Sequence, residues 1–176
     1  MKTRQIAFDS VLAAMCAVLG ALALDFGNLR ITFEDVPVLI GALMFGAPEG
    51  SAIGFVGTFI YQIIRYGFTA TTFLWILPYC LCGLFVGLYA KRRGFRLSRG
   101  RTILIVVLAE IMITTLNTGV LYIDSKIYGY YSAVYIFGTL LPRYAICVGK
   151  AVAVGAVLPK LVSVCGRAAR GGKAAA

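Results

Sequence analysis

Long apolar runs recur from one end of the chain to the other, and they constrain its fold more than any other feature. A helix needs about 20 mostly apolar residues to cross a lipid bilayer. Of the 176 residues, 60% are hydrophobic and only 14% are charged, whereas roughly a quarter of the residues in a soluble domain are charged. One small core cannot bury so large an apolar excess. The sequence therefore predicts an integral membrane protein.

Glycine, proline and polar clusters divide these runs into segments of helical length. We expect an all-α fold, a single membrane domain of six transmembrane helices followed by a basic, Ala/Gly-rich tail over residues 159–176. Pro142 lies inside the sixth apolar run and predicts a kink there. The six predicted helices cover about residues 6–24, 34–45, 48–66, 72–89, 102–123 and 133–158.

The net charge of +10 comes from basic residues that lie mainly just beyond the apolar runs. They are concentrated near the N-terminus, in the loop over residues 91–101 and in the C-terminal tail, all on one side of a six-helix bundle. The loops on the other side hold only Arg30, Arg65 and Lys126. Because basic residues are enriched in cytoplasmic loops, we expect both termini to be cytoplasmic. This distribution favours contact with anionic lipid over nucleic acid as a partner.

Small residues line one face of the first predicted helix. Ala13, Ala17 and Ala21 recur every four residues, a spacing that lets two membrane helices approach closely. Two interpretations remain open, namely packing inside this bundle and docking on the helix of a partner subunit. The Gly50–Gly54 and Gly83–Gly87 pairs have the same spacing, and for them we favour packing inside the bundle.

Two ionisable residues lie deep in the fifth and sixth predicted helices. Glu110 and Lys150 each stand about eight residues, or roughly 12 Å, from the inner ends of their helices. Antiparallel neighbours would therefore hold them at the same depth. Because charges inside a membrane are tolerated when they are paired, we expect a Glu110–Lys150 ion pair. A structural role is favoured over direct ligand contact.

Seven residues further outward on the same helices stand Asn117 and Arg143. They also share a depth, and no acid on either helix is an obvious partner for Arg143. A guanidinium group suits a carboxylate or phosphate, and an asparagine amide both donates and accepts hydrogen bonds. The pattern favours ligand binding over a structural role.

Aromatic side chains gather around the predicted outer loops before the fourth and sixth helices. For most of the tyrosines we favour the interfacial aromatic belt of membrane proteins. The alternative is that Trp75 and tyrosines such as Tyr122 stack on a flat ligand.

The sequence offers little for catalysis. Histidine is absent, which excludes a His-based triad and His metal sites. The chain contains no phosphate-binding Gly-x-x-x-x-Gly-Lys-Ser/Thr motif. Its five cysteines do not have metal-ligand spacing, and its few carboxylates are scattered. We therefore expect no catalytic residues, no metal, no cofactor and no enzymatic activity.

Several short segments, in order along nearly the whole chain, resemble the substrate-capturing S components of energy-coupling factor (ECF) transporters. Two of them, in the fifth and sixth predicted helices, are similar to the folate-type S components. The segments are Ala13/Ala17/Ala21, residues 36–46 (VPVLIGALMFG), Gly50/Gly54, residues 116–118 (LNT) and residues 141–143 (LPR).

This resemblance implies a vitamin-binding protein of the bacterial plasma membrane that works with a membrane coupling subunit and two cytoplasmic ATPases. It implies that the alanine face of the first helix docks on the coupling subunit. It also implies a ligand cavity on the outer side, with Arg30, Trp75, Asn117 and Arg143 among its residues.

Folate is the leading substrate, with pantothenate, another B-vitamin or a related precursor as alternatives. The chain departs from the folate-type pattern at residues 57–60 (GTFI), where relatives often carry an Asp, and at residues 71–75 (TTFLW). The rival functions are a self-sufficient secondary carrier or channel, a membrane enzyme and a structural subunit.

Overall fold

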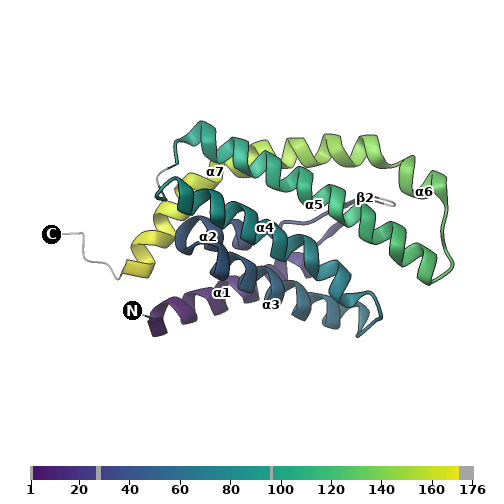
Figure 1. The fold of residues 1–176 in the computed structure, drawn as a ribbon, viewed down its shortest axis with the longest axis horizontal. Coiled ribbons are helices and arrows are strands. Elements are labelled where there is room, and N and C mark those ends of the chain that lie inside the picture. Colours follow the sequence, from purple (N-terminus) through teal and green to yellow (C-terminus); the bar gives the residue numbers. More distant parts are fainter. Residues whose placement is uncertain (1, 27–28, 96, 171–176) are drawn as a thin grey trace.

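The computed structural model describes residues 2–26, 29–95 and 97–170. Over these residues the chain forms a bundle of six main helices, one short extra helix and a three-residue-per-strand hairpin (Figure 1). The predicted all-helical membrane fold is confirmed apart from this hairpin. The elements are α1 (Lys2–Ala21), β1 (Leu24–Phe26), β2 (Leu29–Ile31), α2 (Asp35–Phe45), α3 (Ala47–Tyr66), α4 (Thr72–Arg92), α5 (Arg99–Ile127), α6 (Ala133–Phe137) and α7 (Leu140–Arg170).

Four helical stretches in the described part of the chain are long and apolar enough to cross a membrane: α1, α4, α5 and the α6–α7 segment. The 20 residues of α3 reach about 30 Å at 1.5 Å per residue, but Glu49, Gln62 and Arg65 make this helix less apolar. Large apolar side chains such as Val134 and Leu141 are 82% and 84% exposed. Exposed apolar surface on this scale suits contact with lipid.

The centre of the bundle is the short helix α2. Its 11 residues span only about 16 Å, too little to cross a membrane, and Val38, Leu39 and Ala42 are fully buried. The helix packs against α1, α3, α4 and α7. It ends at Gly46, which has a φ of 112°, a value that glycine adopts without strain. This sharp turn lets α3 begin at the next residue.

Helices α3 and α4 lie in backbone contact through glycines. A methyl group added at Gly83 would stand 2.3 Å from the Gly50 carbonyl carbon, and one at Gly54 would stand 2.7 Å from the Tyr79 oxygen. No side chain fits such gaps, so the glycines let the two helices approach each other closely. The prediction that these glycines pack inside the bundle is confirmed.

Several predicted boundaries are wrong. Helix α1 ends at Ala21 rather than at residue 24, because the following residues pair as an antiparallel hairpin with Leu24 opposite Ile31. Pro142 does not kink a helix interior. It lies in the first turn of α7, where a backbone N–H has no acceptor within the helix, so a proline is tolerated. The helix break falls just before it, between α6 and α7. The predicted tail also begins later, since α7 continues to Arg170.

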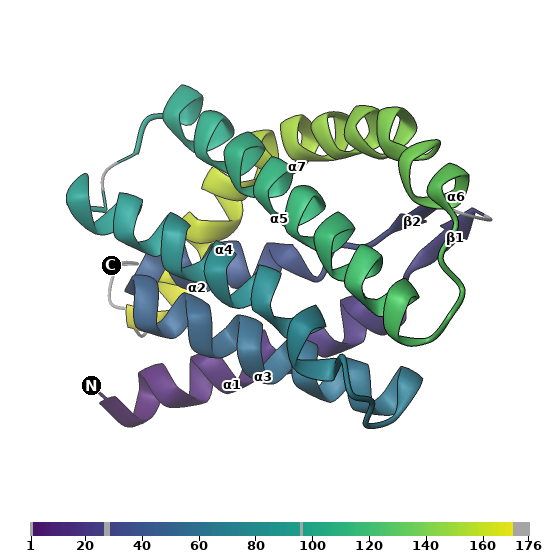
Figure 2. The same cartoon turned by 45° about the vertical axis from the view of Figure 1, so that its right-hand side comes forward.

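One end of the bundle carries the start of α1, the end of α7 and the basic connection between α4 and α5 (Figure 1). The opposite end carries the hairpin, the connection from α3 to α4 and the segment from α5 to α6. Figure 2 shows the hairpin beside α6 at this second end. The fold thus separates a basic end from a loop-covered end.

Candidate ligand-binding cavity

Two adjacent hollows lie toward the loop-covered end of the bundle. The larger one, here called the outer cavity, has a volume of about 620 Å³. The smaller one, the inner pocket, has a volume of about 100 Å³. Both are lined by Thr32, Tyr79, Asn117 and Arg143, and these four residues are called the neck. Small-molecule sites usually have volumes of roughly 300–1,000 Å³, and only the outer cavity falls within this range.

Aromatic side chains supply much of the outer cavity wall. Tyr61 and Tyr66 stand edge to face, with ring centroids 6.0 Å apart, and their hydroxyl groups are 3.3 Å apart. Trp75, which also lines this cavity, donates from Nε1 to Asp124 Oδ1 at 3.3 Å. Rings held in this way offer flat apolar faces on which a planar ligand can stack.

Asp124 gathers three donors at the outer end of α5. Its carboxylate accepts hydrogen bonds from Thr71, Trp75 and Tyr130. Burial and the bond to Asp124 raise the pKa of the Tyr130 phenol. Because Thr71 and Trp75 belong to the start of α4 and Tyr130 to the connection after α5, Asp124 ties two loop regions together. Sequence reasoning missed this residue, although an acid within a cluster of tyrosines was the available signal.

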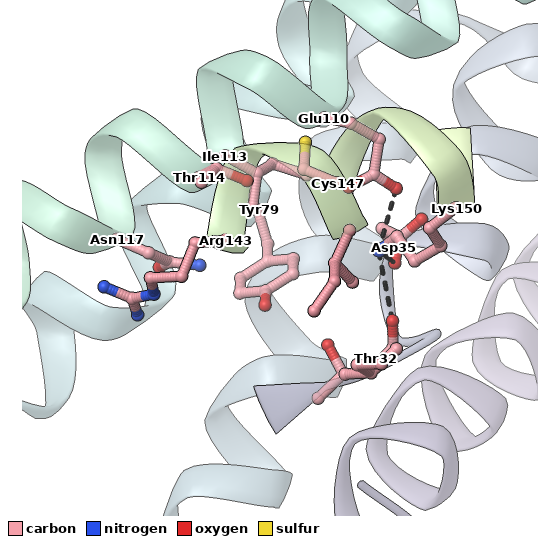
Figure 3. Close-up of a pocket in the computed structure, with 12 residues that line it drawn as sticks. Thr32, Asp35, Tyr79, Glu110, Ile113, Thr114, Asn117, Arg143, Cys147 and Lys150 are labelled. Atoms are coloured by element: carbon pink, nitrogen blue, oxygen red, sulfur yellow. Dashed lines mark hydrogen bonds and ion pairs between the residues drawn. The ribbon is translucent and has the colours of Figure 1, made fainter. Parts of the chain in front are cut away.

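The neck contains two buried polar atoms without a partner. Asn117 Oδ1 and Arg143 Nη1 are both buried and make no hydrogen bond within the described part of the chain. The two side chains lie close together in Figure 3, beside Tyr79, as their predicted common depth requires. Buried polar groups are nearly always hydrogen-bonded, so these two atoms mark a place for a ligand.

The inner pocket ends on a buried ionic cluster. Lys150 Nζ lies 2.8 Å from Asp35 Oδ1 and 2.9 Å from Glu110 Oε1, and donates to the Thr32 carbonyl at 3.1 Å (Figure 3). The structure thus brings together Glu110 and Lys150. Sequence reasoning missed the contact of Asp35 with Lys150. Helix α2 brings that carboxylate to the middle of the bundle.

Tyr122 was predicted to contact the ligand, but the structure places it away from both hollows. The outer cavity is lined on α5 by Asn117, Leu121 and Asp124, which follow one helix face. Tyr122 stands five residues after Asn117 and so points about 140° away around the helix. It is 42% exposed and packs edge to face on Tyr131, with ring centroids 5.5 Å apart.

Of the other predicted contacts, Trp75, Asn117 and Arg143 all line the outer cavity. Arg30 belongs to β2, and its side chain lies outside the described residues.

The predicted docking face on α1 is mostly buried in the structure. Ala13 and Ala17 are only 5% and 8% exposed, while Ala21 is exposed. A methyl group added at Gly57 on α3 would stand 2.5 Å from Cys16 Cβ and 2.8 Å from the Ala13 oxygen. Because Gly57 lacks a side chain, α1 lies against α3 along this face. Ala13 and Ala17 therefore pack against the bundle, and docking of this face on a coupling subunit stays a prediction.

This architecture and sequence match a known protein family. The family model described as "ECF transporter, substrate-specific component" matches residues 4–161. A search of curated proteins by sequence gave no match.

Two solved structures share the fold. One is FolT bound with folic acid (TM-score 0.69, 22% identity, covering 91% of this chain and 97% of that chain). The other is the S-component for biotin from an ECF-type ABC transporter (TM-score 0.66, 14% identity, covering 92% of each chain). The family model and the apolar helices together show that this chain belongs to the substrate-specific components of ECF transporters and is a multi-pass protein of the cell membrane.

Proposed function

We propose that this chain captures a folate-type vitamin from outside the cell and passes it inward together with a membrane coupling subunit and two ATPases. The observation that carries the proposal is the neck, where Asn117 Oδ1 and Arg143 Nη1 are buried without partners beside an aromatic cavity of about 620 Å³. Such a site combines apolar walls with a few convergent polar groups, as small-molecule sites do.

Folate is the proposed substrate because its chemistry suits the two parts of the site. A flat heterocycle and a benzoyl ring match the aromatic walls, and polar ring atoms match the neck. The similar fold of FolT, which binds folic acid, supports the same choice.

The orientation follows from charge. The basic connection between α4 and α5 lies at the end of the bundle that carries the start of α1 (Figure 1). We assign that end to the cytoplasm by the positive-inside rule, which turns the loop-covered end and its cavity outward.

The direct test measures binding and uptake separately. Calorimetry on the detergent-purified chain should show saturable binding of folic acid, with pantothenate and biotin as comparison ligands. In proteoliposomes, uptake should require the coupling subunit, the ATPases and ATP. Uptake by the chain alone would instead establish a secondary carrier, and binding of none of the three ligands would remove the vitamin-capture proposal.

Replacing Arg143 with alanine should weaken folic acid binding by roughly 1.5–3 kcal/mol, the cost of losing a charged hydrogen bond. This equals an increase in Kd of about 10- to 150-fold, to be measured by calorimetry. Arg65→Ala serves as a comparison at the rim of the outer cavity, where solvent screening makes the expected effect smaller. An unchanged Kd for Arg143→Ala would remove this residue from the site.

The two sides of α1 should respond differently to a larger side chain. Ala17→Leu forces extra volume against α3 and should lower the free energy of unfolding by about 1–3 kcal/mol. Ala14 is exposed, so Ala14→Leu should leave stability and folic acid binding unchanged. If the exposed face of α1 contacts the coupling subunit, Ala14→Leu will nevertheless reduce ATP-driven uptake. Thermal unfolding with and without folic acid, combined with uptake, separates these outcomes, and normal stability of Ala17→Leu would contradict its packing role.

A further inference from the structure

The segment that joins α4 to α5 carries a dense positive charge without an internal counter-charge. Residues 91–101 contain six basic residues and no acidic one. Five of these side chains belong to the described chain, where all are exposed, and together they are called the basic patch: Lys91, Arg92, Arg93, Arg99 and Arg101. Within the described chain none of the five forms an ion pair. Crowded like charges repel one another, so the patch favours an anion from outside the chain.

The basic patch lies where two helices leave the membrane. The candidate span in α4 ends at Arg92, and the one in α5 begins at Arg99. The 21 residues of α4 reach about 31 Å at 1.5 Å per residue, close to the roughly 30 Å thickness of the hydrocarbon core. When α4 spans the bilayer, the patch therefore stands at the level of the lipid headgroups, at the end of the bundle that carries the start of α1 (Figure 1).

The connection that carries the patch is fixed to the bundle. Phe95 has a φ of 58°, a left-handed conformation that is unusual for a bulky residue. Its N–H donates to the Ala90 carbonyl at 2.9 Å, and its ring lies beside Gly46, where an added methyl group would stand 3.7 Å from Cζ. Leu97 packs against the core. A connection held at these points loses less conformational freedom when the neighbouring side chains bind an anion.

The chemistry of the patch favours phosphate. Four of its five residues are arginines, whose planar guanidinium groups bind phosphate oxygens through paired hydrogen bonds. The Arg93 guanidinium lies over the Tyr89 ring, 5.7 Å from its centroid, and a stacked guanidinium keeps its N–H edge for an anion. Phosphate is the anion that a bilayer supplies at headgroup depth, whereas an acidic protein surface would have to enter the headgroup layer to reach it.

We propose that the basic patch binds the headgroups of anionic phospholipids through their phosphodiester groups. Bound lipid compensates the repulsion within the patch. It also fixes the depth at which this end of the bundle sits, because interfacial lysine and arginine side chains anchor membrane helices. This binding is independent of the proposed vitamin capture.

The first experiment compares two lipids on the unaltered chain. Native mass spectrometry of the detergent-purified protein, titrated with phosphatidylglycerol or phosphatidylcholine of identical acyl chains, should show the anionic lipid bound at about tenfold lower concentration or less. Inorganic phosphate in excess should not displace it. Equal binding of the two lipids overturns the proposal. Displacement by inorganic phosphate also overturns it, since the patch would then hold a free anion and not a lipid.

The second experiment changes the patch at exposed positions on both helices. Arg92→Gln combined with Arg99→Gln should weaken phosphatidylglycerol binding about 25-fold, because each basic residue near an anionic surface contributes roughly fivefold in affinity. Arg65→Gln combined with Lys126→Gln is the matched control, since it removes the same charge at the loop-covered end and should leave this binding unchanged.

Unchanged lipid binding by the patch variant, or an equal loss in the control, overturns the proposal. The alternative occupant is an acidic face of a partner protein. A patch variant that binds phosphatidylglycerol normally but no longer assembles with the coupling subunit and ATPases would establish that occupant in place of lipid.

Discussion

Replacing Lys150 with methionine will destabilise the protein by about 3–5 kcal/mol, because removing one partner of a buried ion pair leaves the other charge uncompensated. Lys150 holds two carboxylates, Asp35 at 2.8 Å and Glu110 at 2.9 Å. Both acids are almost fully buried, at 1% and 2% exposure. Methionine keeps the length and most of the volume of the lysine stem, so the loss reports on charge. Denaturant titration of the protein in mixed micelles, or its melting temperature, provides the measurement.

The control removes the charges together. A triple variant, Lys150→Met with Asp35→Asn and Glu110→Gln, contains no buried charge at this place and should recover much of the lost stability, since neutral replacements of buried ion networks are often tolerated. If Lys150→Met alone is as stable as the wild-type chain, the ionic cluster has no structural role. If the triple variant is no more stable than Lys150→Met, the loss came from packing and not from charge.

This cluster also shows what the sequence could and could not predict. Glu110 and Lys150 lie at matching distances from the ends of two long helices, so helical geometry alone places them at one depth. Asp35 cannot be placed in the same way. It follows an irregular segment, and only the central position of α2, which depends on contacts with four other helices, brings its carboxylate to Lys150.

The same limit applies to the predicted faces of α1 and α5. A four-residue repeat shows that Ala13, Ala17 and Ala21 lie near one face of a helix, but not which neighbour that face meets. Gly57 on α3 decides the matter, because its missing side chain makes room for α1. For Tyr122, enrichment of aromatic residues indicated the correct end of the bundle. The direction of a side chain around α5 depends on how the whole helix is rotated in the bundle.

The pairing of Asn117 with Arg143 in the neck could be predicted from the sequence because it depends on only two helices. Asn117 and Arg143 lie seven residues from Glu110 and Lys150, close to two helical turns, so one register fixes both pairs. The hairpin β1–β2 was not foreseen, since three-residue strands are too short to show an alternating pattern. Thr32, which directly follows β2, lines both hollows, and its carbonyl accepts a hydrogen bond from Lys150. In this way a loop residue contributes to the site.

Replacing Gly83 with alanine will reduce the free energy of unfolding by about 3 kcal/mol, at the upper end of the cost of overpacking a buried site. The added methyl group would stand 2.3 Å from the Gly50 carbonyl carbon, 2.4 Å from its oxygen and 2.6 Å from Ser51 N. These are backbone atoms, which cannot move aside as a side chain can. Helices α3 and α4 would have to separate, and both carry walls of the outer cavity, so folic acid binding should weaken as stability falls.

Gly149→Ala is the matched control, since Gly149 lies inside α7 and a methyl group added there meets nothing within 4 Å. Alanine favours a helix over glycine by up to about 1 kcal/mol, so this variant should be as stable as the wild-type chain or slightly more stable. Melting temperatures of both variants, measured in one detergent, provide the comparison. Equal behaviour of Gly83→Ala and Gly149→Ala would show that α3 and α4 can repack around a methyl group. Loss of stability confined to Gly83→Ala would establish that close backbone contact between these helices supports the cavity.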